Sequence, residues 1–231
     1  SCYRCPFGKK SPCGGKSCAP AVNALDKYLK RNSKKVAAIV MEPLVQAAAG
    51  MLVHPAGFLK DVEKAAGKHN VLLIVDEVAT GFGRTGRMFA CEHEGVRPDM
   101  VAVAKGITGG YMPLAATLAT DEIYSAFCGE YGEFKTFFHG HTYTGNPLAC
   151  AAAVAKLKLF RKEKTLVKLD GKMQYLSNKL RDFYSLKHVG DVRQTGMMAG
   201  VELVKNRETK EDFPADLKIG IKVCAHARKH G

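Results

Sequence analysis

Two ionisable residues, Lys105 and Asp76, lie where two buried strands of a sheet are expected to end. The apolar residues 100–104 run directly into Lys105, and the apolar residues 71–75 run directly into Asp76. A lysine amine can form a Schiff base with an aldehyde and then move protons as a general base and acid, and a carboxylate can keep a pyridine nitrogen protonated. Pyridoxal 5'-phosphate (PLP) requires both groups. We therefore predict that PLP binds here, with Lys105 as the catalytic residue and Asp76 at the ring nitrogen.

Val78 is the third residue of this predicted site. It projects on the same side of an extended chain as Asp76, where it would press on one face of the cofactor ring. Ordinary core packing is the alternative for Val78, as helix capping is for Asp76 and solvent exposure for Lys105. Residues 81–86 match the dinucleotide pattern G-x-G-x-x-G. A dinucleotide-binding fold needs a full helix directly after these glycines and an acidic residue at the end of the next strand. Here the next strand ends at Lys105, so the sequence disfavours a nicotinamide or flavin cofactor.

The segment 137–146 concentrates hydroxyl and imidazole groups just before an expected helix. Hydroxyls and backbone amides near a helix N-terminus suit a phosphate, so Thr142 is a candidate phosphate ligand. His139 and His141 could bind a metal ion. They have no acidic or cysteine neighbour, however, and hydrogen-bonded loop histidines are the favoured interpretation.

Four of the eight cysteines lie in the first twenty residues. Their number resembles that of a zinc site, and reduced loop cysteines are the alternative. The four candidate zinc ligands are Cys2, Cys5, Cys13 and Cys18. The cysteines are too scattered for a disulfide scaffold, which favours a reducing, cytoplasmic setting.

The expected elements place Lys105 and Asp76 at the same edge of one sheet. Strand 36–41, helix 58–69 and strand 71–75 form a right-handed crossover unit with parallel strands, and strand 100–104 follows. A strand at 114–120 is expected to be antiparallel, and Asn146 and Pro147 begin a helix that runs to about residue 163. We predict an α/β fold with a loop segment at 1–20, a large PLP-binding domain at 21–164 and a small α+β domain at 165–231.

The bulk composition indicates a globular protein without a nucleic-acid or membrane partner. Of the 231 residues, 46% are hydrophobic, and the formal charge of +13 is spread over several segments, as on a solvated surface. The sequence has no apolar stretch of membrane-spanning length, and its first residues lack the charged-then-apolar pattern that is expected of a secretion signal. It begins with Ser1 instead of methionine, so its true start is expected to lie upstream.

With these residues placed, the sequence resembles the class III, fold-type I PLP-dependent aminotransferases. The similar stretches are Glu42-Pro43 with Gln46 and Gly50, residues 76–86, residues 104–106 and residues 144–147. The resemblance implies a homodimer with a shared active site, a small-molecule amino donor and a keto acceptor. It implies that Lys105 and Asp76 hold the cofactor, that Thr142 reaches the phosphate of the neighbouring subunit, and that Gly140 borders the substrate site. His141, beside Thr142, stands where some members have proline.

Within the family, the resemblance is strongest to members that aminate 8-amino-7-oxononanoate in biotin biosynthesis, with S-adenosylmethionine or lysine as donor. The stretches that carry it are residues 2–6, 89–94, 107–110 and 138–140. Another class III ω-aminotransferase, of ornithine or 4-aminobutyrate type, is an alternative. A zinc-stabilised basic binding module is a further one. Family members extend beyond both ends of this chain, so we expect it to be a fragment that binds PLP poorly and turns over little by itself.

Overall fold

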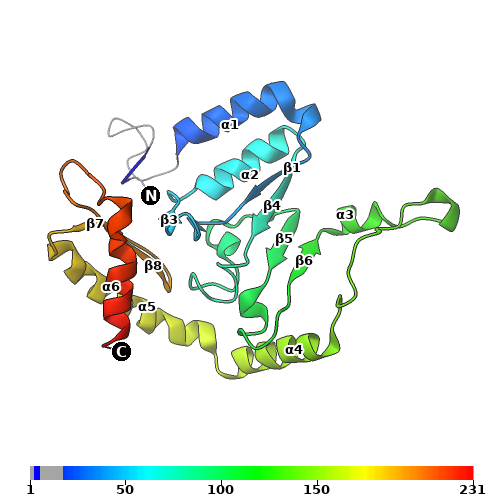
Figure 1. Cartoon of the computed structure of the whole chain (residues 1–231). Coiled ribbons are helices and arrows are strands. Elements are labelled where there is room, and N and C mark those ends of the chain that lie inside the picture. The colour runs from blue at the N-terminus through cyan, green and yellow to red at the C-terminus, as the bar shows by residue number, and fades with distance from the viewer. Residues whose placement is uncertain (1–2, 6–17, 231) are drawn as a thin grey trace.

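The computed structural model describes residues 3–5 and 18–230, and its centre is a four-stranded sheet (Figure 1). The strand order is β1 (Ala38–Met41), β4 (Leu72–Asp76), β5 (Met100–Val103) and β6 (Ala116–Ala119). β1, β4 and β5 are parallel, and β6 is antiparallel to β5. The α/β fold and the direction of all four strands are therefore as the sequence predicted, with strand bounds shifted by up to two residues.

Two helices, α1 (Ala19–Asn32) and α2 (Phe58–Lys68), cover one face of this sheet. The apolar side chains of α2 recur at helical spacing, and they pack with Leu73 and Val75 of β4 in the main hydrophobic core. Because side chains alternate along a strand, Leu72, Ile74 and Asp76 lie on the opposite face. That face is less covered, since Leu72 is 40% exposed.

A hairpin that the sequence analysis did not predict separates β1 from α2. Its strands, β2 (Val45–Gln46) and β3 (Leu52–Val53), are antiparallel. Left-handed backbone angles at Gly50 (φ +99°) and Met51 (φ +54°) turn the chain between them. The hairpin matters for the site because Met51 reaches a cavity described below.

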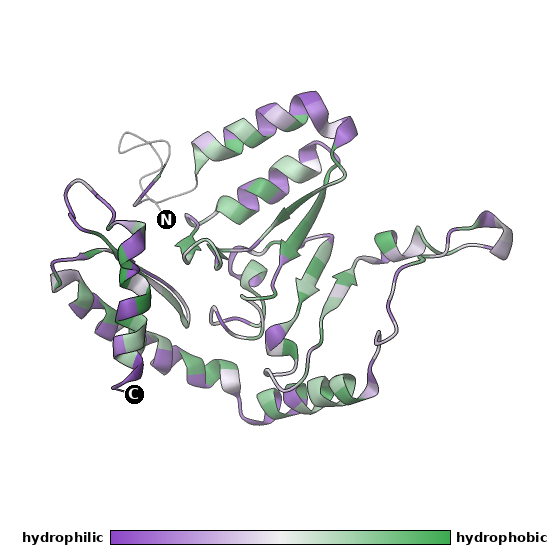
Figure 2. Ribbon diagram, viewed as in Figure 1, coloured by the Kyte–Doolittle hydropathy of each residue, from purple (hydrophilic) through white to green (hydrophobic). Residues whose placement is uncertain are grey.

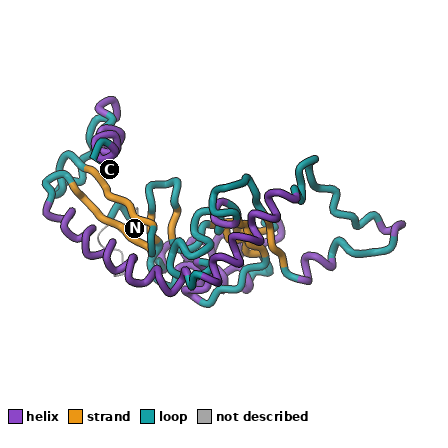
Figure 3. The backbone as a smooth tube through the Cα atoms, turned by 90° about the horizontal axis from the view of Figure 1, so that it is seen from below, coloured by secondary structure: helices purple, strands orange, loops and turns teal. Residues whose placement is uncertain are grey.

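The chain between β6 and α4 (Pro147–Lys162) extends away from the sheet, with a short helix α3 (Asp121–Ser125) near its start (Figures 1 and 3). Every residue from 124 to 145 is exposed. The Asn146 side chain then caps α4 by accepting a hydrogen bond from the Ala149 amide at 3.1 Å, as its sequence position predicted. Hydrophobic residues occupy much of α4 and of the central strands (Figure 2).

The last part of the chain contains another two-stranded sheet. Helix α5 (Thr165–Arg181) leads to β7 (Val189–Thr195) and β8 (Met198–Leu203), which are antiparallel, and α6 (Ile219–Arg228) follows. Arg193 of β7 ties this sheet to the β2–β3 hairpin, because its guanidinium donates to the Gly50 and Met51 carbonyl oxygens at 2.9 and 3.1 Å.

Short 3-10 helices occur at Ser33–Lys35, Ala90–Glu94, Lys105–Ile107, Tyr131–Glu133, Asp182–Ser185 and Ala215–Leu217. Among the described residues, no helix combines the length and the apolar composition that crossing a membrane requires.

Candidate active site

Parallel pairing brings Asp76 and Lys105 to the same edge of the sheet. Asp76 is the last residue of β4 and pairs in register with Ala102 of β5. The chain continues from Ala102 through Val103 and Ala104 to Lys105, which begins a single 3-10 turn. Because the carboxyl ends of parallel strands open on one side, both side chains belong to the edge where open α/β sheets bind ligands.

Lys105 lies between two cavities, of about 960 Å³ and about 520 Å³, and contributes to the lining of both. The larger cavity is bounded by residues 112–115 and by the segment that enters α4, including His141 and Asn146. The smaller cavity is lined by residues 78, 79, 81, 82 and 84 after β4, by residues 105, 106, 109 and 110 after β5, and by Met51 and Met198. Arg84, Lys105 and Lys156 are the charged residues of this smaller lining, and all three are basic.

The loop after β4 is organised by the buried carboxylate of Glu77, which is 0% exposed. Its oxygens accept hydrogen bonds from the Thr80 hydroxyl at 2.5 Å and from the Cys91 amide at 2.9 Å. Its own amide donates to the Ala102 carbonyl oxygen at 2.9 Å, which extends the pairing of the two strands by one residue. Glu77 therefore fixes the path of the chain on either side of Val78, which lines the smaller cavity.

A close contact between Phe82 and Gly106 joins this loop to the turn that carries Lys105. A Cβ atom at Gly106 would lie 2.9 Å from two side-chain carbons of Phe82, so only glycine fits without displacement. Lys105 itself has a left-handed backbone (φ +43°), which is uncommon for a residue other than glycine. The position of Lys105 thus depends on the loop that follows the neighbouring strand.

The predicted cofactor residues do not all line the same cavity. Val78 and Lys105 line the smaller cavity together, and the Asp76 carboxylate accepts a hydrogen bond from the Val78 amide at 3.0 Å. His141 lines the larger cavity with Lys105. Within the described part of the chain, Asp76 lines neither of these two cavities.

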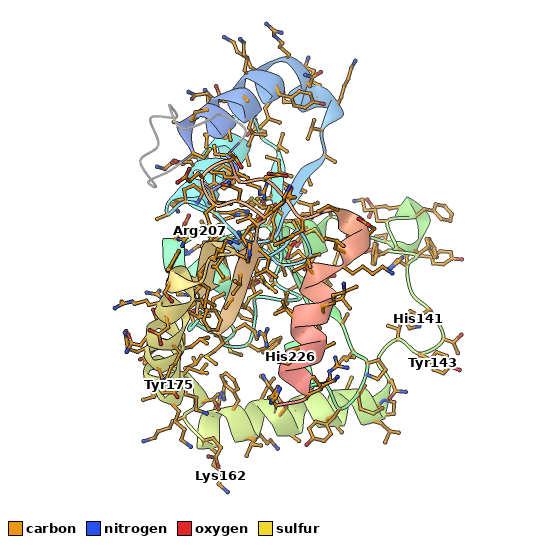
Figure 4. All side chains as sticks on the ribbon, turned by 60° about the vertical axis from the view of Figure 1, so that its left-hand side comes forward. His141, Tyr143, Lys162, Tyr175, Arg207 and His226 are labelled. Carbon is orange, nitrogen blue, oxygen red and sulfur yellow. The ribbon has the colours of Figure 1, made fainter. Side chains whose placement is uncertain are left out.

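Thr142 and Gly140 lie on the exposed segment and, of the residues described, line neither cavity. The same segment carries His141 and Tyr143, which Figure 4 shows set apart from the body of the molecule on the chain that leads into α4. The Tyr143 amide donates to His141 Nδ1 at 3.1 Å, so that imidazole is engaged locally.

Two of the four candidate zinc ligands, Cys2 and Cys13, lie outside the described ranges. Cys5 and Cys18 are free thiols. The residues at 3–5 and 18–230 contain no group of three or more His, Cys, Asp or Glu side chains that could hold a metal ion. Zinc at the start of the chain stays a prediction.

Some residues of the site were not singled out from the sequence. Asn146 and Tyr143 line the larger cavity, and their place in the same segment 137–146 as Thr142 could have identified them. Lys156 lies in the smaller cavity with its ammonium nitrogen 4.2 Å from the ring centre of Phe82 and 4.3 Å from that of Phe160. Nothing local to Lys156 in the sequence distinguishes it from the other lysines of α4.

Residues 3–231 match the family described as aminotransferase class-III. The chain is 54% identical over 231 residues to the adenosylmethionine-8-amino-7-oxononanoate aminotransferase of Geobacter sulfurreducens, covering 100% of this chain and 50% of that protein. A crystal structure of the enzyme of that name from Methanocaldococcus jannaschii aligns with a TM-score of 0.89 and 44% identity over 95% of this chain and 50% of the other. A crystal structure of an omega-transaminase from Thermomicrobium roseum aligns with a TM-score of 0.89 and 37% identity, covering 100% of this chain and 50% of the other. The chain therefore spans about half the length of the relatives that it matches.

Proposed function

The chain belongs to the class III aminotransferases, and from this we propose that it is part of an enzyme that transfers an amino group to 8-amino-7-oxononanoate in biotin biosynthesis. The observation that carries the proposal is the similarity, over 92–100% of the chain, to relatives named for that reaction. S-adenosylmethionine is the donor that those names indicate, and lysine is the other donor to be tested. The activity is proposed for the longer protein of which this chain corresponds to about half.

The residues present fit PLP as the cofactor. Lys105 offers a primary amine to two cavities, Val78 offers an apolar side chain within one of them, and Asp76 offers a carboxylate at the end of the neighbouring strand. When bound, PLP supplies a protonated heterocycle that withdraws electrons from the reacting carbon. Asp76 would hold the proton on the ring nitrogen, and Val78 would support one face of the ring.

Lys105 carries out the proton transfers in this proposal. Its Nζ atom would hold the cofactor covalently in the absence of substrate. As a free amine, the same group would serve as the base that takes a proton from the substrate carbon bearing the nitrogen, and as the acid that returns a proton. The turn that holds Lys105 against the 77–86 loop would keep this amine in reach of the reacting carbon.

We include in the proposal a homodimer in which Thr142 and His141 contribute to the cofactor site, with Thr142 reaching the phosphate bound by the partner and Gly140 bordering the substrate. The exposed segment that carries them supports this arrangement, because it also displays Phe138 at 85% and Tyr143 at 75% exposure. A cytoplasmic location and the division into domains at residue 164 belong to the same proposal.

Trapping of PLP on the chain tests the proposed site without requiring turnover. The longer protein that contains this chain is mixed with PLP, reduced with borohydride, digested and analysed by mass spectrometry. We expect the label on Lys105, its loss in Lys105→Ala, and its retention in Lys158→Ala, which alters an exposed lysine of α4. Label distributed over surface lysines, with no preference for Lys105, would contradict the assignment.

A coupled transamination assay tests the substrate. 8-Amino-7-oxononanoate is offered as acceptor with S-adenosylmethionine or lysine as donor, and ornithine and 4-aminobutyrate are offered in parallel. An ω-amine aminotransferase is the second candidate, since the omega-transaminase fits the chain with the same TM-score of 0.89 as the biotin-pathway enzyme. Turnover of ornithine or 4-aminobutyrate alone would select that candidate. The remaining alternative, a zinc-stabilised basic binding module, would leave the match to the class III aminotransferases unexplained.

A further inference from the structure

The ammonium group of Lys156 occupies an unusual position for a lysine of a surface helix. Its nitrogen is buried and has no hydrogen-bond partner among the described residues. The ring centres of Phe82 and Phe160 lie 4.2 and 4.3 Å from it. Burial lowers the pKa of this amine, and cation–π attraction to the two rings opposes that effect by favouring the charged form.

The two rings differ in what they connect. Phe160 is on α4 itself, one turn after Lys156, so its contact is local to the helix. Phe82 belongs to the loop that follows β4, and it has a left-handed backbone (φ +56°). The Lys156 contact with Phe82 therefore joins α4 to that loop across the smaller cavity, which Lys156 and Phe82 line together.

The Phe82 side chain also contacts the 3-10 turn that carries Lys105. The Phe82 side chain lies so close to Gly106 that a Cβ there would be 2.9 Å from it. Gly106 follows Lys105 in the chain, and the turn is closed by the Ile107 amide donating to the Ala104 carbonyl oxygen at 3.1 Å. A shift of the Phe82 ring thus removes the support on which this turn rests.

We propose that Lys156 is a positioning residue for Lys105, and that it acts by holding the Phe82 ring against Gly106. A methionine would fill a similar volume between the rings, so packing alone does not call for an ammonium. The charge adds a directional attraction to the face of Phe82 that an apolar side chain does not provide. The effect on the backbone of the turn is independent of the enzyme's activity, whereas the effect on the reactivity of Lys105 rests on the proposed function.

Hydrogen exchange of individual amides measures the first effect. Lys156→Met removes the charge, Lys156→Arg retains it in a side chain that also stacks on rings, and Lys158→Met alters an exposed lysine of the same helix as a matched control. In Lys156→Met we expect the Ile107 and neighbouring turn amides to exchange about tenfold faster, within the range set by a cation–π contact. Arginine should restore the slow exchange, and the Lys158 variant should match the unaltered protein.

The rate of PLP trapping at Lys105 measures the second effect. We expect Lys156→Met to slow trapping several-fold and Lys156→Arg to restore it. Should Lys156→Met fail to fold, Phe160→Leu removes one ring and leaves the ammonium and Phe82 in place, and we expect a smaller acceleration confined to the same turn.

The proposal would be overturned by unchanged exchange at the turn, by equal acceleration across the whole protein, or by failure of arginine to restore both measurements. Altered exchange with an unaltered trapping rate would also overturn it, because Lys105 would then not depend on Lys156. Failure of the unaltered longer protein to trap PLP at Lys105 is a different outcome. It would refute the proposed function, and the exchange measurements would still decide whether Lys156 supports the turn.

Discussion

Arg193 is the residue whose loss we expect to damage this structure most clearly. Its side chain is 8% exposed and pairs with two carboxylates, Asp191 at 3.0 Å and Glu202 at 2.7 Å. It also donates to the carbonyl oxygens of Gly50 and Met51. Met51 lines the smaller cavity together with Lys105, so the Arg193 guanidinium joins the β7–β8 sheet to the wall of the candidate site.

The magnitude follows from what Arg193→Met leaves behind. The variant keeps an apolar side chain of similar length but removes one hydrogen-bond donor group from two carboxylates and two carbonyl oxygens. Removing one partner of a buried ion pair typically costs about 3–5 kcal/mol. Here Asp191 and Glu202 are 18% and 21% exposed, and Glu202 keeps its ion pair with Arg4 at 2.8 Å. We therefore expect a loss near the lower limit, about 3 kcal/mol.

Urea unfolding measures this loss. With a slope of about 2 kcal/mol/M, the midpoint should fall by roughly 1.5 M. Lys168→Met is the control, because its pair with Glu163 joins side chains that are 59% and 49% exposed. Such a surface pair contributes about 0–1 kcal/mol. A decrease below about 1 kcal/mol for Arg193→Met, or one equal to that of the control, would refute the reasoning.

The pH dependence provides a second check on the same cluster. Burial raises the pKa of Glu202, but hydrogen bonds from Arg193 and Arg4 outweigh it and hold the pKa below the ordinary 4.5. A carboxyl group with a lowered pKa stabilises the fold above its unfolded pKa, and this contribution is lost as the pH falls through the folded value. The acid-side loss should therefore be smaller in Arg193→Met than in the unaltered protein.

Three further predictions concern other described residues. Burial lowers the pKa of His54 from 6.5 to about 4. As the pH falls, the unfolded chain therefore binds a proton at His54 before the folded protein does, and the free energy of unfolding should decrease by up to about 3 kcal/mol between pH 6.5 and 4 in urea titrations. His54→Gln should flatten this pH dependence. Burial, with the charge of Glu77, raises the pKa of the Cys91 thiol to about 12, so a thiol reagent should label it only on unfolding, whereas exposed Cys128 reacts at once. Gly106→Ala should destabilise the protein by about 1–3 kcal/mol in urea and slow PLP trapping, since its Cβ would lie 2.9 Å from Phe82; unchanged trapping would show that this contact is not needed.

The sequence predicted the elements of this fold well because their signals are local. Continuous apolar runs marked the three parallel strands β1, β4 and β5, and Asn146 with Pro147 marked the start of α4. Short connections and the handedness of crossover units then fixed the parallel neighbours. The β2–β3 hairpin escaped prediction because its strands are two residues long, too short for a period to be visible.

The site divides in the same way. The sequence by itself determined that Lys105 and Asp76 follow adjacent parallel strands, and hence that they share one edge of the sheet. The tertiary structure alone decided what surrounds them: the Phe82 ring on Gly106, the ammonium of Lys156 on that ring, and Arg193 bonded to a hairpin 143 positions away in the chain. Contacts between distant segments depend on how whole elements pack, and no spacing along the chain encodes them.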